Sequence, residues 1–432
     1  MTLRRVDVRG FSGNRRALAE ALPQPVDEQG RSSAAVAAII AEVRAGGDAA
    51  LRRLTQQFDG VSLEELRVPA EEVQAALGRI PDDLSEALGI AHDRILAYHA
   101  HESAPDVPDF EDAGVTVRHL VRPVSRAGCY APGGRARYPS TVLMCAVPAH
   151  VAGVEETILC VPPGPDGRVD DATLAAAAVA GIEEIYRVGG AQAIAAMAYG
   201  TESIGAVDVI VGPGNRYVAE AKRMVSGVVG IASAFAGPSE VVVIAGPDTS
   251  PALAAIDLVV QAEHGPDGLA WLVTWSAEVA EAVIAEVDRL VEASPRRDDL
   301  EANLGAGGVV VLVDGPKQAC AVANIVAPEH LELLTEDADG LLAHITSAGA
   351  VFLGPNSPAV MGDYLAGPNH VLPTNRTARF ASALRVDDFR RHVHAVRITE
   401  KAMEVLGPHV VTLAEVEGLP AHAESVRARW RG

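Results

Sequence analysis

The pattern of hydrophobic positions changes along the chain and divides it into regions. Residues 1–25 are mixed and polar, and we interpret them as an arm. Apolar residues then recur at helical spacing, which predicts helices from residue 32 or 33 to the glycines at 46 and 47, then over 50–58, 70–77 and 81–101. His99 and His101, at the end of the last helix, are expected to face solvent. Residues 114–121 predict a strand or hairpin.

From Cys129 onward, short apolar runs alternate with segments of helical spacing. The predicted strands cover residues 127–131, 157–161, 184–188, 207–211, 240–245, 270–275, 308–313 and 350–353. The predicted helices between them cover residues 141–154, 173–180, 192–199, 216–225, 251–264 and 278–293. Such alternation is typical of βαβ units and parallel sheets. It predicts an α/β fold with two sheets. One interpretation is that the second sheet is a divergent repeat of the first.

The last fifty residues follow a third pattern. Charged residues crowd positions 385–397, and two helices, 400–406 and 420–430, follow without strands between them. This break predicts a small C-terminal domain that packs elsewhere, and another subunit is one candidate for its neighbour.

Composition narrows the class of protein. Of the 432 residues, 49% are hydrophobic and only 4% aromatic, as in soluble α/β enzymes. No apolar run approaches the width of a bilayer and the first residues do not form a signal peptide, so we expect a cytoplasmic protein. The four cysteines are widely spaced, which favours buried thiols over disulfides. A net charge of −21 disfavours nucleic acid and anionic membranes as partners.

The end of the helix before Gly265 is a candidate metal site. Ser250 suits the N-cap and Pro251 the first turn, while Gly265 and Pro266 end the helix. Gln261 and His264 are three residues apart and therefore share one helix face. The carbonyl end of a helix favours a cation, and these two side chains are possible metal ligands. A merely polar helix end is the alternative.

Other polar clusters also suggest chemistry. Two glycine-rich turns, 132–134 and 212–215, follow predicted strands, and their backbone N–H groups are suited to binding an anion. Neither turn matches the dinucleotide-binding fingerprint, and the alternative is that both are ordinary tight turns without a ligand. Glu329 and His330 are adjacent groups for proton transfer. The loop 361–374 combines Asp, Asn and His with Gly and Pro, a composition typical of functional loops.

Taken together, these segments resemble the histidinol dehydrogenase family from about residue 46 to 426. The resemblance rests on residues 130–134, 189–195, 212–215, 237–240, 261–264, 328–330, 362–364, 369–374 and 417–422. Members of this family are zinc enzymes that oxidise L-histidinol to L-histidine through L-histidinaldehyde, with two NAD+, as the last step of histidine biosynthesis.

The resemblance implies a role for each matched residue. It implies one Zn2+ per subunit, held by Gln261, His264, Asp363 and His422, with the last contributed across a homodimer. Glu329 and His330 are implied to be catalytic: His330 takes the alcohol proton, and Glu329 activates water for the aldehyde step. Substrate-binding positions are implied at Ser239, Gln261, His264, Glu329, Asp363, His370, Glu417 and His422, and NAD-binding positions at Tyr130, Gln192 and Asn215.

The resemblance also implies a domain plan of two incomplete Rossmann-like domains. The expected boundaries are 1–25 for the arm, 26–128 with 242–384 for the first α/β domain, 129–241 for the second, NAD-binding domain, and 385–432 for a helical C-terminal domain that reaches the partner subunit. Two alternatives stay open. One is a paralogue that oxidises another small alcohol, such as a sulfonated diol, and the other is a zinc-binding scaffold without activity.

Overall fold

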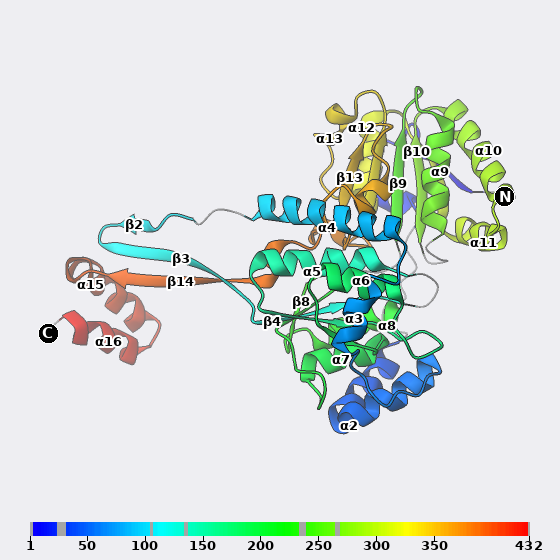
Figure 1. The fold of residues 1–432 in the computed structure, drawn as a ribbon. Coiled ribbons are helices and arrows are strands. Elements are labelled where there is room, and N and C mark those ends of the chain that lie inside the picture. The colour runs from blue at the N-terminus through cyan, green and yellow to red at the C-terminus, as the bar shows by residue number, and fades with distance from the viewer. Residues whose placement is uncertain are drawn as a thin grey trace. The chain divides into compact units, whose positions relative to one another are not determined.

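The computed structural model describes residues 3–23, 32–103, 107–133, 137–232, 239–263 and 268–430. The chain forms two compact units, each described here by itself (Figure 1). The first unit comprises Met1–Glu102 and Ser125–Phe389, and the second comprises Ser103–Val124 and Arg390–Gly432. Within the described residues, none of the helices is both long and apolar enough to span a bilayer.

The first unit contains a six-stranded parallel sheet with the strand order β1-β11-β10-β9-β12-β13. Its strands are β1 (Arg4–Asp7), β9 (Glu240–Ala245), β10 (Leu269–Thr274), β11 (Gly308–Leu312), β12 (His330–Leu334) and β13 (Ala350–Leu353). The accompanying helices are α1 (Arg15–Ala21), α9 (Pro251–Ala262), α10 (Ala277–Ala293), α11 (Arg297–Gly307), α12 (Pro316–Val326), α13 (Ala338–Leu342) and α14 (Ala359–Tyr364).

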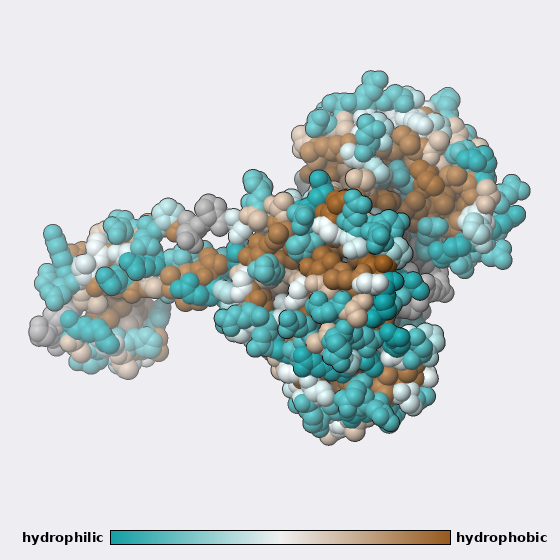
Figure 2. Space-filling model, in the orientation of Figure 1, coloured by the Kyte–Doolittle hydropathy of each residue, from teal (hydrophilic) through white to brown (hydrophobic). Residues whose placement is uncertain are grey.

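Strand β9 shows why both faces of this sheet are covered. Its side chains alternate between the faces, so Val241 and Val243 join the core with α9, α10 and α11, whereas Val242 and Ile244 join the core with α12 and α13. Because both faces are buried, the strand is apolar after its first residue, as in other parallel sheets. Figure 2 shows hydrophilic residues around the outer helices α10 and α11.

The segment expected to be an arm belongs in part to this sheet. Strand β1 pairs in parallel with β11, and α1 contacts α12. Its sequence, Arg-Arg-Val-Asp, lacks an apolar run, because it is an edge strand with little of its surface buried. The structure therefore differs from the expected boundary at residue 25.

The same unit contains a second parallel sheet with the order β6-β5-β4-β7-β8. Its strands are β4 (Arg126–Tyr130), β5 (Glu156–Cys160), β6 (Glu184–Tyr186), β7 (Val209–Val211) and β8 (Gly230–Ile231). The helices near it are α2 (Ser33–Asp59), α3 (Ala70–Ala76), α4 (Asp82–Glu102), α5 (Pro139–Ala152), α6 (Asp171–Val179), α7 (Gly190–Tyr199) and α8 (Arg216–Val225). The prediction of an α/β fold with two parallel sheets is confirmed.

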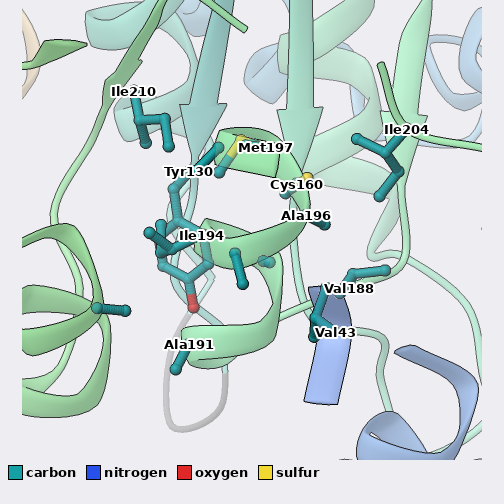
Figure 3. Close-up of a cluster of buried hydrophobic side chains, with 14 of the residues drawn as sticks. Val43, Tyr130, Cys160, Val188, Ala191, Ile194, Ala196, Met197, Ile204 and Ile210 are labelled. Carbon is teal, nitrogen blue, oxygen red and sulfur yellow. The ribbon is translucent and has the colours of Figure 1, made fainter. Parts of the chain in front are cut away.

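One buried cluster joins α2, α7 and α8 to this second sheet. It includes Val43 from α2, Ile194 from α7 and Ile210 from β7 (Figure 3). The break expected at residues 46 and 47 is a kink within α2, where Gly47 has φ 51° and ψ −134°. A side chain at Gly47 would collide with the Glu202 carboxylate, which accepts the Asp48 N–H at 2.7 Å.

The second unit is built on an antiparallel sheet in which β3 (Val115–Pro123) lies between β2 (Phe110–Asp112) and β14 (Arg390–Ile398). Helices α15 (Glu400–Val416) and α16 (Pro420–Trp430) pack together through Val411, Ala414 and Ala423. The expected C-terminal domain began at 385 and lacked residues 103–124, which belong here because β3 pairs with β14 over its full length.

Candidate active site

The starts of two neighbouring strands bring the expected catalytic residues together. Ser239 directly precedes β9, Glu329 directly precedes β12, and His330 is the first residue of β12. The two strands are parallel neighbours, with His330 paired to Val241. These side chains therefore gather at the amino-terminal edge of the first sheet.

Two helix ends reach the same edge. Helix α9 ends at Ala262, directly after the buried Gln261, and Asp363 lies near the end of α14. Gln261, His330 and Asp363 line one small pocket. The carbonyl ends of helices carry partial negative charge, so this pocket favours a cation.

Hydrogen bonds fix the carboxylate of Glu329. Its Oε2 accepts the Ser239 hydroxyl at 2.6 Å and the Glu240 backbone N–H at 3.0 Å, while Ser239 Oγ lies 3.3 Å from Gln261 Oε1. Burial raises the pKa of the Glu329 carboxyl, and the nearby His330 and the Ser239 hydroxyl oppose that rise. The Glu329 carboxylate is therefore fixed in position by hydrogen bonds and is largely shielded from solvent.

The imidazole of His330 lies between acidic groups. Its Nδ1–H donates to the Glu240 carbonyl at 3.2 Å, and its Nε2 lies 3.4 Å from Asp363 Oδ1. Burial by itself would lower the pKa of His330, but the Glu329 and Asp363 carboxylates raise this pKa to about 9. The ring is therefore positioned to hold a proton next to Asp363.

Glu240 is an acidic residue at this edge that sequence reasoning missed. Burial, followed by repulsion from Glu329, raises its pKa to about 8, and its Oε1 accepts the Asn375 N–H at 2.9 Å. The available signal was an acidic side chain at the first position of an apolar strand. In the sequence it is the last residue of the motif 237–240.

His370 connects Asp363 to helix α5. Its Nδ1–H donates to the Asp363 carbonyl at 2.7 Å, and its Nε2 lies 3.3 Å from the Thr141 hydroxyl. The preceding residue, Asn369, is buried and lies 3.4 Å from His99 Nε2. His99 is fully buried, so the expectation that it faces solvent was wrong; its two ring nitrogens contact Asn369 and Glu102.

The three expected NAD-binding residues belong to the second sheet. Tyr130 ends β4, and its hydroxyl accepts the Gly190 N–H at 3.0 Å at the start of α7; Figure 3 shows the ring beside Ile194. Gln192 is buried in the first turn of α7, and Asn215 caps α8 by accepting two backbone N–H groups. All three follow the carboxyl ends of strands, where this class of sheet binds ligands.

Strands β4 and β7 are hydrogen-bonded neighbours, and the strand order reverses between them. A side chain at Gly212, with φ 103°, would overlap the Tyr130 carbonyl oxygen. The carbonyl of Gly212 accepts a hydrogen bond from the buried Lys222. Burial lowers the pKa of Lys222 to about 8. The sequence analysis did not identify this lysine, because a lysine within a helix is ordinarily exposed to solvent.

The remaining expected residues fall outside the described part of the first unit. His264 lies outside the described residues, and Glu417 and His422 belong to the second unit, at the end of α15 and in the first turn of α16. Across the described parts of the chain, no three His, Cys, Asp or Glu side chains form a group that could hold a metal ion. The full ligand set therefore remains a prediction.

Comparisons with known proteins show what this chain is similar to. The family model described as histidinol dehydrogenase matches residues 23–430. A histidinol dehydrogenase of Parasynechococcus marenigrum is 47% identical over 94% of this chain and 92% of the relative, and one of a Synechococcus species is 49% identical over 92% of each. A crystal structure of histidinol dehydrogenase from Elizabethkingia anophelis superposes with a TM-score of 0.92, at 35% identity, over 99% of this chain and 98% of that one.

Proposed function

This chain belongs to the histidinol dehydrogenase family of dehydrogenases, and on that premise we propose that it oxidises L-histidinol to L-histidine through L-histidinaldehyde. The observation that carries the proposal is the Glu329–His330 pair at the start of β12, with Ser239 on one side and Asp363 on the other. A dehydrogenase that acts twice on one carbon needs one group to take the alcohol proton and another to activate water.

We propose Zn2+ and NAD as the cofactors. The amide oxygen of Gln261 and the carboxylate of Asp363 line one pocket and are ligand types that zinc accepts, so the described residues fit the metal. The proposed set is completed by His264 and His422. When bound, zinc would orient the amine and imidazole of the substrate, and NAD+ would accept hydride.

In the first step, we propose that His330 takes the proton of the substrate hydroxyl as hydride leaves the carbinol carbon. The proton moves to the unprotonated Nε2 of a neutral imidazole, and the Glu329 and Asp363 carboxylates stabilise the imidazolium that forms. In the second step, Glu329 removes a proton from water, whose oxygen adds to the aldehyde carbon. Loss of a second hydride and of one more proton then gives the carboxylate of the product. The fixed rotamer of Glu329 supports this role, since both donors hold the same oxygen.

The substrate contacts favour histidinol over a sulfonated diol. Glu417 and His370 are the proposed partners of its cationic amine and imidazole. A histidinol-dependent NADH assay, run before and after chelation and repeated with dihydroxypropanesulfonate, tests the proposal. NADH formation with histidinol that chelation abolishes is the expected result. Turnover of the sulfonated diol alone would establish the paralogue, and no turnover of either alcohol by the zinc-loaded protein would establish the inactive scaffold.

We further propose a cytoplasmic homodimer whose partner subunit supplies Glu417 and His422. The support lies in the second unit, where α15 exposes the large apolar side chains of Val405, Leu413 and Val416, by 61%, 64% and 83%. An exposed apolar face of this kind is typical of a protein–protein interface. The helix that carries it, α15, is followed in the sequence by α16, which contains the proposed ligand His422. All four cysteines are free and buried, as suits a reducing compartment.

Subunit complementation tests the shared site. A His264→Ala chain and a His422→Ala chain, each inactive alone, should regain activity when they form mixed dimers, because one site then carries both defects and the other carries neither. Mass spectrometry of tagged chains confirms subunit exchange. Verified mixed dimers without activity above the parents would show that each site is built within one chain.

A further inference from the structure

Two carboxyl groups line the same pocket as Gln261, His330 and Asp363 but have no place in the chemistry above. Glu332 lies two residues after His330 on β12, so both side chains point to the same face of the sheet. Asp257 lies four residues before Gln261 on α9 and therefore shares its helix face. Glu332 is 1% exposed, an unusual environment for a carboxyl group.

The carboxyl group of Glu332 interacts with two different helices. Oε1 accepts the backbone N–H of Ala359 at 2.8 Å, and Ala359 is the first residue of α14, the helix that carries Asp363. In the described residues no donor reaches Oε2, and the Glu332 carboxyl interacts with the carboxyl of Asp257, which lines the same pocket from α9. A hydrogen bond between two carboxyl groups needs one shared proton, and burial, the main cause, raises the pKa of both groups and so retains that proton.

We propose that Asp257 and Glu332 are positioning residues, which set the spacing of α9, β12 and α14 and thereby the spacing of Gln261, His330 and Asp363. The inference rests on the proposed function for the roles of these three residues. Its physical basis is that a metal ion tolerates little error in ligand position, and that groups behind the ligands commonly control affinity. Helix α9 ends and strand β12 begins at this edge of the sheet.

Zinc affinity, measured by competition with a chelator, tests this role independently of turnover. Asp257→Ala and Glu332→Ala should each weaken zinc binding about 10- to 100-fold, the usual effect of removing a group that orients a ligand. Glu332→Gln should stay within about threefold of the unchanged protein, because its amide oxygen accepts the Ala359 N–H and its NH2 donates to Asp257. The same order is expected for kcat with histidinol.

A matched control separates positioning from general stability. Asp48→Ala removes another buried carboxylate, one that does not line this pocket. The Asp48 carboxylate accepts the Ser203 N–H at a distance of 3.2 Å. It should lower the melting temperature without changing zinc affinity.

Three outcomes would overturn the proposal. Folded Asp257→Ala and Glu332→Ala proteins with unchanged zinc affinity would show that the pair positions nothing. A Glu332→Gln protein as weak as Glu332→Ala would show that negative charge, and not geometry, is what matters. Absence of zinc binding by the protein without substitutions would refute the metal assignment, and with it this proposal. Zinc binding without histidinol turnover would refute only the proposed function.

Discussion

Replacing Glu329 by glutamine separates the water-activating step from the rest of the reaction. The amide oxygen of glutamine can accept the same two hydrogen bonds, from the Ser239 hydroxyl and the Glu240 N–H, so the side chain should keep its rotamer. The free energy of unfolding should then change by less than about 1 kcal/mol. Loss of the base should slow aldehyde oxidation about 10²- to 10⁴-fold, which corresponds to about 3 to 5 kcal/mol of barrier.

Single-turnover experiments measure the two steps separately. With limiting histidinol, the Glu329→Gln protein should form the first NADH within about tenfold of the normal rate and the second much more slowly. Histidinaldehyde supplied directly should show the full defect. Glu240→Gln is a matched control, because it replaces the adjacent buried carboxyl, whose raised pKa of about 8 keeps it largely protonated near pH 7, and it should leave both phases nearly unchanged. Equal losses in both half-reactions of Glu329→Gln would refute this division of roles.

Three further predictions follow from individual contacts. Ser239→Ala removes a hydrogen bond that stabilises the charged form of Glu329, so the pKa of Glu329 should rise. The acidic limb of the pH–rate profile for aldehyde oxidation should therefore move to higher pH, and an acidic limb that stays in place would contradict this prediction. Asp363→Asn should lose zinc, by metal analysis, and most activity while its circular dichroism stays normal; full zinc content with full activity excludes Asp363 as a ligand. Tyr130→Phe leaves the Gly190 N–H without its acceptor and should cost about 1 kcal/mol in urea unfolding, and an unchanged unfolding midpoint would contradict that bond.

The sequence predicted best those elements whose burial is continuous. Strands β9, β10 and β11 have long apolar runs because helices cover both faces, and their observed bounds lie within one residue of the predicted ones. Strand β12 was not predicted as a strand, although it lies beside β9 in the sheet. Its sequence, His-Leu-Glu-Leu-Leu, places polar side chains at two buried positions, which only their partners in the folded protein explain.

The candidate site likewise contains residues that the sequence predicted and residues that it did not. The residue types at Glu329, His330 and Asp363 were predicted from motifs, and the structure gathers them at one edge. Glu332 and Lys222 were not predicted as buried groups, because each depends on a partner that sequence spacing does not reveal. Glu332 meets Asp257, 75 positions earlier, and Lys222 donates to a carbonyl of a sharply turning loop.

The position of β1 has a consequence for synthesis of the chain on the ribosome. Arg4 pairs with Val309, so the first strand to emerge waits for a partner that is made about 300 residues later. All strands of the second sheet, by contrast, lie between Arg126 and Ile231 and emerge as one uninterrupted run. That sheet can therefore form while the chain is still being translated. The sheet that carries Glu329 and His330 can close only once β11, β12 and β13 have been made.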